Sequence, residues 1–193
     1  DPYSQDAWYN LGILYNKSEQ SDLAIDAYDF ALAIEPTFGS AFFNKANTFA
    51  NKGEYQKAIN VYQEYLLLDD QNPDVFYYLG ECYEKISQVD KALDVYYRAI
   101  DIDKNYSDAW FGIAVIKYMQ DDLPESLHYI KHAIKINDSN TDYWFFFGQI
   151  NARLNFVDDA ANAYRRAVEI DPYDAEIWLN YSDLYYIHDE VYV

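Results

Sequence analysis

Two histidines and a glutamate are spaced so that a single helix would present all three to one metal ion. Glu125, His128 and His132 follow one another at intervals of three and four residues. Imidazole and carboxylate groups are common zinc ligands. No further histidine or cysteine stands at a recognisable ligand spacing, so we predict a solvated helix face here, without a metal or another cofactor.

The remaining candidates for chemistry are a single cysteine and several acidic pairs. Cys82 follows the apolar stripe of a predicted helix, and no histidine stands near it in the sequence, so we expect a buried structural thiol rather than a nucleophile. The acidic pairs lack the spacing and the glycine of a calcium loop, and no phosphate-binding or dinucleotide fingerprint is present. We therefore predict no enzymatic centre. The pairs are Asp69-Asp70, Asp121-Asp122 and Asp158-Asp159.

Charge and composition exclude other classes of function. The 193 residues include 33 acidic and 14 basic ones, which gives a net charge of −19. This charge repels phosphate backbones and anionic lipids, so nucleic acid is a poor partner. No apolar stretch approaches the roughly 20 residues that cross a bilayer, and we expect no membrane insertion. One cysteine does not indicate a compartment, and the localisation stays open.

The elements that carry these residues repeat every 34 residues along the chain. An aromatic residue marks each repeat, and a small residue follows it four positions later, where another helix can approach closely. The small residues are therefore expected to serve packing. The aromatic series is Trp8, Phe42, Phe76, Trp110, Trp144 and Trp178, and the small series is Gly12, Ala46, Gly80, Ala114, Gly148 and Ser182.

Each repeat has the pattern of two amphipathic helices. In the first repeat two sets of residues follow the i, i+3, i+4, i+7 spacing of one helix face, and the segment between them is only long enough for a tight turn. Proline at Pro36 and Pro172 closes two of the repeats, and Asp122 is expected to cap a helix that has Pro124 in its first turn. The pattern predicts an all-α fold of helical hairpins.

The chain resembles the tetratricopeptide repeat (TPR) family. Its departures from the family pattern are Lys117 and Asn151, where the family prefers an aromatic residue, and Tyr65, where it prefers alanine. The resemblance implies a right-handed superhelical solenoid of antiparallel helix pairs, whose concave surface is lined by the first helix of each pair and binds proteins or peptides. In the first repeat it rests on Trp8, Leu11, Gly12, Tyr15, Ala24, Tyr28, Ala31 and Pro36.

We expect a single array over residues 1–193, excised from a longer protein. Asp1 and Pro2 align with the closing dipeptide of a preceding repeat, and the chain stops after the first helix of a sixth. Uncapped repeats expose apolar faces, so self-association through the ends is possible. The expected repeats are 5–38, 39–72, 73–106, 107–140 and 141–174, with a partial repeat at 175–193.

A ladder of large apolar side chains stands one position after the aromatic markers. Two interpretations are open. The rings fill the contact between neighbouring first helices, or they stay partly exposed and anchor a partner, as aromatic residues do at interfaces. We favour the second. The rungs of this aromatic ladder are Tyr9, Phe43, Tyr77, Phe111 and Phe145, and Leu179 continues the column.

An acidic column runs one helical turn before the ladder. First-turn carboxylates complement the helix dipole whatever the function, yet they would also steer a basic partner. The two roles are compatible, so we predict a basic partner segment that carries apolar or aromatic anchors. The acidic residues are Asp6, Asp74, Asp108, Asp142 and Glu176, with Ser40 in the second repeat.

Some family members grip a peptide backbone through asparagines, and this chain matches them only partly. Tyr78, Gly112 and Phe146 interrupt the asparagine column, and the lysines and arginines that clamp a chaperone tail are missing. We predict a protein-binding or peptide-binding scaffold that is not a chaperone-tail adaptor; the alternative is a structural spacer or an end-to-end assembling segment. The polar candidates are Asn10, Asn44 and Asn180, with Asn47, Glu81 and Gln149 nearby.

Overall fold

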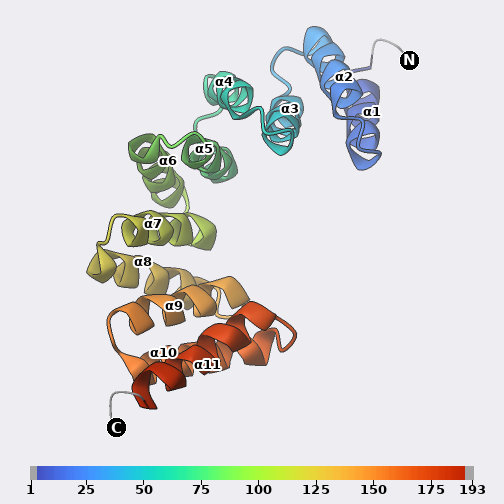
Figure 1. Cartoon of the computed structure of the whole chain (residues 1–193). Helices are drawn as coiled ribbons and strands as arrows, with labels where there is room; N and C mark the ends of the chain where they lie inside the picture. The colour runs from blue at the N-terminus through green and yellow to red at the C-terminus, as the bar shows by residue number, and fades with distance from the viewer. Residues whose placement is uncertain (1–3, 190–193) are drawn as a thin grey trace. The chain divides into compact units, whose positions relative to one another are not determined.

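The computed structural model describes the backbone of residues 4–189 and the side chains of residues 4–184 (Figure 1). This part of the chain forms eleven α-helices and no strand, so the all-α prediction is confirmed. Asp1 and Pro2 lie outside the described residues. The helices are α1 Gln5–Lys17, α2 Ser21–Ile34, α3 Gly39–Asn51, α4 Tyr55–Leu66, α5 Pro73–Lys85, α6 Val89–Ile102, α7 Ser107–Met119, α8 Leu123–Ile136, α9 Thr141–Arg153, α10 Val157–Ile170 and α11 Ala175–Asp189.

The first helices keep the 34-residue register of the sequence. α1 begins at Gln5 and α3 at Gly39, and every later first helix begins another 34 residues on, up to Ala175 in α11. The expected helix ends are confirmed: α2 ends at Ile34 before Pro36, and the Asp122 carboxylate accepts a hydrogen bond from the Glu125 amide (3.4 Å) at the start of α8.

The helices divide into two compact units. Unit 1 contains α1 to α6 and ends at Ile102, and unit 2 begins at Asp103 and contains α7 to α11. Within each unit the two helices of a pair pack against each other, and the second helix of a pair packs against the first helix of the next. No pair can bury its apolar face alone, so each unit is stabilised by this stacking.

The buried contact inside each pair joins a small residue to a large one. A Cβ atom added to Gly12, Gly80 or Gly148 would lie 2.3 to 2.4 Å from a ring carbon of the tyrosine sixteen residues later. The role of this column in packing is confirmed at these glycines. The packing prediction is wrong at Ser182, because this residue is exposed and its hydroxyl donates to the Leu179 carbonyl (2.8 Å).

Two of the departures from the family pattern are accommodated locally. Tyr65 is 7% exposed, and its ring occupies the space that a side chain on Gly39 would need, since a Cβ there would lie 2.8 Å from it. Asn151 is buried and donates through Nδ2 to the Phe147 carbonyl (2.7 Å). The departures therefore leave the helix pairs intact.

Candidate binding face on the first helices

The five rungs of the aromatic ladder are all half-buried. Four of them pack against a buried tyrosine nineteen residues later, on the second helix of the same pair. The ring centroids lie 5.9 to 6.3 Å apart. These tyrosines are Tyr28, Tyr62, Tyr96 and Tyr164.

In unit 1 the rungs also contact the next helix pair. The Asn44 amide donates to the Tyr9 hydroxyl (2.9 Å), and the Phe43 ring lies 5.6 Å from the Tyr78 ring in an edge contact. One side of each ring therefore fills the contact between helix pairs, as the packing interpretation predicts. The half-exposed remainder is the part that a partner could contact, and binding there stays a prediction.

One hollow of unit 1 collects four of the predicted residues. It has a volume of about 310 Å³ and is lined from α1, α3, α4, the segment before α5 and the first turn of α5. We call it hollow 1. Its lining comprises Tyr9, Gly39, Ser40, Phe43, Asn44, Tyr65, Asn72 and Asp74.

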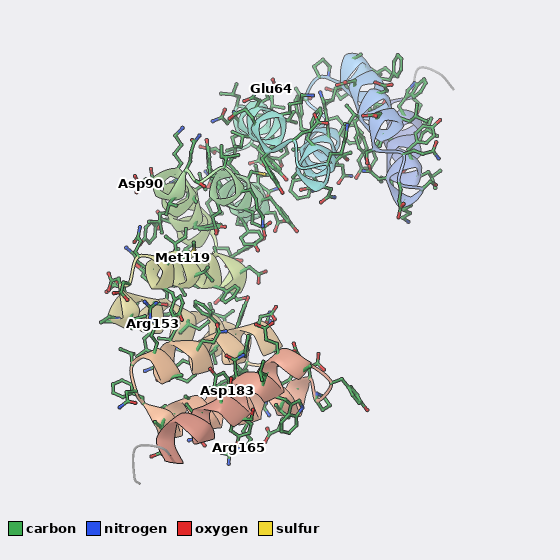
Figure 2. All side chains as sticks on the ribbon, in the orientation of Figure 1. Glu64, Asp90, Met119, Arg153, Arg165 and Asp183 are labelled. Atoms are coloured by element: carbon green, nitrogen blue, oxygen red, sulfur yellow. The ribbon has the colours of Figure 1, made fainter. Side chains whose placement is uncertain are left out.

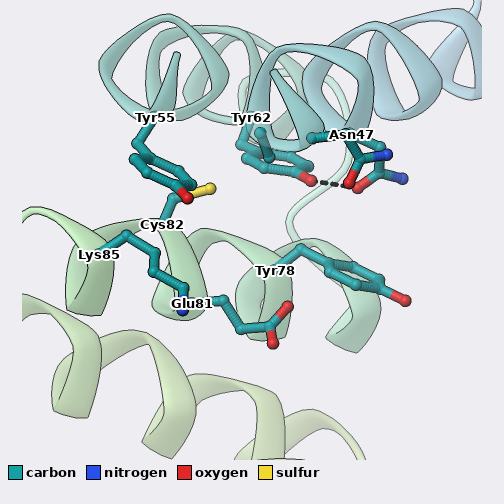
Figure 3. A pocket seen from close by; sticks show the side chains of 9 residues that line it. Asn47, Tyr55, Tyr62, Tyr78, Glu81, Cys82 and Lys85 are labelled. Atoms are coloured by element: carbon teal, nitrogen blue, oxygen red, sulfur yellow. Dashed lines mark hydrogen bonds between the residues drawn. The ribbon is translucent and has the colours of Figure 1, made fainter. Parts of the chain in front are cut away.

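Hollow 2 lies between the next two helix pairs and is larger, with a volume of about 550 Å³. Two predicted residues, Asn47 and Glu81, line it. Figure 3 shows Tyr55, Tyr62 and Asn47 on one side of the hollow, and Tyr78 and Glu81 on the other. The complete lining is Asn47, Ala50, Asn51, Tyr55, Tyr62, Tyr78, Glu81, Cys82 and Lys85.

Two buried groups inside hollow 2 have perturbed acidity. The Tyr62 hydroxyl donates to the Asn47 Oδ1 atom, and its pKa is raised by burial and then by Cys82, Tyr78 and Glu81. Burial, with a smaller contribution from Glu81, raises the pKa of the Cys82 thiol to about 12. Cys82 is therefore protonated at neutral pH, and the predicted buried structural thiol is confirmed.

The acidic column occupies first turns, as the sequence predicted. Its residues differ in surroundings. Asp74 lines hollow 1, whereas Asp6 and Asp142 are exposed and line neither hollow. Asp108 accepts a hydrogen bond from the Tyr143 hydroxyl, whose pKa is raised by burial and by this carboxylate. Asp108 thus already links α7 to α9, the first helices of two successive pairs.

The polar candidate residues also differ in whether they line a hollow. Asn10 is exposed and Gln149 is half-buried, and neither lines one of the two hollows. The Asn180 amide donates to the Glu176 carbonyl of its own helix (2.9 Å). Asn44, Asn47 and Glu81 are therefore the polar candidates that the fold brings into the hollows.

The corresponding face of unit 2 is filled by aromatic side chains. Phe111 packs against Tyr143 at 5.0 Å and against Phe146 at 5.5 Å, and the Tyr118 ring lies 5.2 Å from Phe146. Phe146 is only 9% exposed. Phe111 therefore contributes to a hydrophobic cluster of unit 2 rather than to a polar hollow.

The sequence reasoning singled out for binding only two of the nine residues that line hollow 2. Asn51 stands four residues after Asn47, and Lys85 four residues after Glu81, so each shares a helix face with a residue that was predicted. That spacing was a usable signal. Tyr78 was noted only as an interruption of the asparagine column, and Tyr55 gave no signal.

The expected solvated face of α8 is wrong for His132. Its ring stacks on Trp110 with centroids 4.5 Å apart and an angle of 16° between the planes, and the residue is half-buried. Burial, followed by His128 and Lys135, lowers the pKa of His132. Among the described residues, no group of three or more His, Cys, Asp or Glu side chains is placed to hold a metal ion. None of the described helices is long and apolar enough to cross a membrane.

Comparison with family models matches nearly the whole chain. A model described as tetratricopeptide repeat matches residues 6–38, and a second one with the same description matches residues 43–107, 111–175 and 147–190. Together these matches span far more than half of the sequence. A search among curated proteins by sequence found no match.

Solved structures with the same fold share little sequence with this chain. The MamA protein is 20% identical with a TM-score of 0.75, over 89% of this chain and 94% of that one. YrrB, described as a TPR protein with an unusual peptide-binding site, is 23% identical with a TM-score of 0.70, over 91% and 90%. PilF of Pseudomonas aeruginosa is 18% identical with a TM-score of 0.85, over 96% and 84%. At these identities the likeness shows the fold.

Proposed function

Because the chain belongs to the tetratricopeptide repeat family, we propose that it is a scaffold that binds a protein or peptide segment on the first-helix face of unit 1. The observation that carries this proposal is the pair of hollows between successive helix pairs of unit 1. Both contain side chains that the sequence singled out for binding. The description of the similar YrrB as peptide-binding is consistent with it.

The lining of the hollows favours a basic segment with apolar anchors. Phe43 and Tyr9 offer half-exposed rings in hollow 1, and Asp74 adds a carboxylate at its edge. Rings of this kind, once a partner removes them from water, commonly dominate the affinity of an interface. The net charge of −19 attracts a cationic segment and speeds its association.

Selection of random peptides displayed on phage tests the proposal. We expect peptides bound by the wild-type chain to be enriched in lysine or arginine together with aromatic or aliphatic residues. Their affinity is expected to fall about tenfold or more in Phe43→Ala, because the variant removes a half-exposed anchor. Their association should slow as salt is raised.

The matched control is Phe30→Ala. This phenylalanine lies on α2, is 53% exposed and stacks on Trp8 at 4.6 Å, outside both hollows. It should leave peptide binding unchanged. Selected peptides that bind Phe43→Ala as tightly as the wild type would contradict the use of this face.

Self-association is a second candidate, favoured by one observation on α11. Trp178 is 48% exposed and Leu179 is 59% exposed, whereas Trp144 and Phe145, at the same positions of the preceding first helix, are half-buried. Exposed apolar surface of this kind promotes association between copies. Sedimentation should then show a mass that rises with concentration and falls in Trp178→Ser/Leu179→Ser. A mass that does not change with concentration would exclude self-association.

A further inference from the structure

We propose that hollow 2 is a receptor for the guanidinium group of an arginine in the bound segment. The inference rests on the proposed function, because it names the partner side chain that the face of unit 1 accepts. It differs from the general expectation of a basic partner, since it assigns one cationic side chain to one hollow. Its residues come from α3, α4 and α5 alone, all within unit 1.

The walls of hollow 2 suit a flat cation. Three tyrosines line it, and Tyr78 is 36% exposed. Edge contacts with the rungs Phe43 (5.6 Å) and Tyr77 (5.2 Å) hold the Tyr78 ring in place. A guanidinium is planar and weakly hydrated, and it stacks on aromatic rings better than an ammonium does.

The lining offers several hydrogen-bond acceptors. Glu81 supplies a carboxylate, whose Oε1 atom accepts from the Tyr77 hydroxyl at 3.2 Å, and Asn51 supplies an amide oxygen. The phenol oxygens of Tyr55 and Tyr78 can also accept. A guanidinium carries five donors in a fixed plane, so it can satisfy several of these oxygens at once.

Glu81 and Lys85 are the two charged residues that line hollow 2. Burial raises the pKa of the Tyr62 hydroxyl and of the Cys82 thiol, and the Glu81 carboxylate adds to both shifts. Lys85 also lines the hollow and extends from the next turn of α5 toward Glu81 (Figure 3). In the free protein Lys85 partly balances the carboxylate, and the incoming arginine takes over that role.

The two charged residues make the proposal testable, since they predict opposite effects. If the occupant is a cation, removal of Glu81 weakens binding and removal of Lys85 strengthens it. An anionic occupant would reverse both effects, and a zwitterionic one would lose affinity in both variants. Lys85 is exposed and its replacement leaves the core untouched, so Lys85→Met remains informative even if Glu81→Gln folds poorly.

The experiment is an NMR titration of the whole chain with Nα-acetyl-arginine methylamide. Nα-acetyl-citrulline methylamide, which has nearly the same shape and no charge, serves as the matched probe. We expect saturable shifts of the Asn47 and Asn51 side-chain amides with the arginine probe, and binding weaker by about tenfold with citrulline. Glu81→Gln should weaken binding of the arginine probe about tenfold, and Lys85→Met should strengthen it about threefold.

Glu64→Gln is the control variant, because Glu64 lies on α4, is exposed and does not line the hollow (Figure 2). It should leave the affinity for the arginine probe unchanged. Equal binding of citrulline and arginine, or weaker binding in Lys85→Met, would overturn the proposal. If neither probe binds while phage-selected peptides still require Phe43, the guanidinium receptor is wrong and the peptide-binding scaffold stands.

Discussion

Tyr78 in unit 1 and Phe146 in unit 2 occupy the same position of the repeat, 68 residues apart, and have different surroundings. Tyr78 is 36% exposed and lines a polar hollow, whereas Phe146 is 9% exposed and packs against Phe111 and Tyr118. The helix pairs form equally well around both. The fold therefore accepts either residue at this position, and the residue present distinguishes a face with a polar hollow from one that is filled.

The neighbouring columns show the same difference. Unit 1 has Asn47 and Glu81 one turn after its ladder, and unit 2 has Val115 and Gln149 there. Farther along the helices, Glu84 of α5 corresponds to Tyr118 of α7, whose ring contacts Phe146. Amides and carboxylates leave polar hollows in unit 1, while aromatic rings close the same region in unit 2. The same positions of the repeat thus line polar hollows in unit 1 and form packing contacts in unit 2.

The largest expected effect is a difference in the free energy of unfolding between substitutions on these two faces. Phe146→Ala should cost unit 2 about 3 kcal/mol, because it leaves a cavity in a buried cluster. Tyr78→Ala should cost unit 1 about 1 kcal/mol or less, because a ring that is partly in water loses less on truncation. Urea unfolding followed by tryptophan fluorescence, which reports mainly on unit 2, and by circular dichroism measures both. Equal losses would show that the two faces are packed alike.

The next effect concerns the small residue inside a helix pair. Gly80→Ala should cost about 2 kcal/mol, because the new Cβ would lie 2.3 Å from the Tyr96 ring. Unit 2 has Ala114 and Ile130 at the equivalent positions, both fully buried in one cluster. In a Tyr96→Ile background, Gly80→Ala should therefore be neutral or stabilising, since alanine favours helix over glycine by about 1 kcal/mol. A double-mutant cycle without coupling would contradict this account of the pair.

A smaller effect is expected from the tyrosine hydroxyls. Tyr62→Phe should destabilise the chain by about 1 kcal/mol, because it removes the hydrogen bond to Asn47. Tyr164 stands at the same position of unit 2, and within residues 4–184 no side chain accepts a hydrogen bond from its hydroxyl. Tyr164→Phe should change the free energy of unfolding by less than about 0.5 kcal/mol. Thermal unfolding of both variants measures the difference, and equal losses would remove the distinction.

The smallest effect is the pH dependence that Glu84 adds to the stability of unit 1. Burial raises the pKa of Glu84, although the Tyr96 hydroxyl and Lys85 act against this. A carboxyl whose folded pKa is raised favours the folded state when protonated, so its contribution is full at low pH and is lost as pH rises through the folded pKa. Glu84→Gln should thus be more stable than the wild type at neutral pH.

That advantage should shrink as the pH falls toward the ordinary pKa of glutamate, and unfolding curves across this range measure it. Tyr118→Phe is the matched variant, because Tyr118 has the same position in unit 2 and lacks a titrating carboxyl. Its difference from the wild type should not vary over the same pH range. A constant difference for Glu84→Gln would contradict the proposed role of burial.

The fold could be predicted from sequence because its determinants recur at a fixed spacing. Trp8, Gly12 and Tyr28 mark the first helix pair, and each later pair has related residues at the same positions of the repeat. Tyr65 departs from this pattern, because the family prefers alanine at its position, and the sequence did not predict how the fold would accommodate it. Its compensation by Gly39 could have been found by comparing the first residue of each first helix, since Gly39 is the only glycine among Gln5, Gly39, Pro73, Ser107, Thr141 and Ala175.

The candidate site could be predicted only in part. Columns of the repeat identified Asn47 and Glu81, but whether a column is open or closed depends on the side chains of two successive pairs. Phe111 and Asp108 belong to the predicted binding columns, and the structure shows that both also make contacts that hold unit 2 together. Tyr55 lines hollow 2 from the start of a second helix, which no reading of the first-helix columns would include.

The most direct test of the central claim is a map of amide NMR shifts on the whole chain, recorded with the tightest peptide from the phage selection. The account predicts that the largest shifts lie in α3 and α5, around Phe43, Asn47 and Glu81, with smaller ones near Tyr9 in α1. Largest shifts in α7 and α9, or on the second helices, would contradict it.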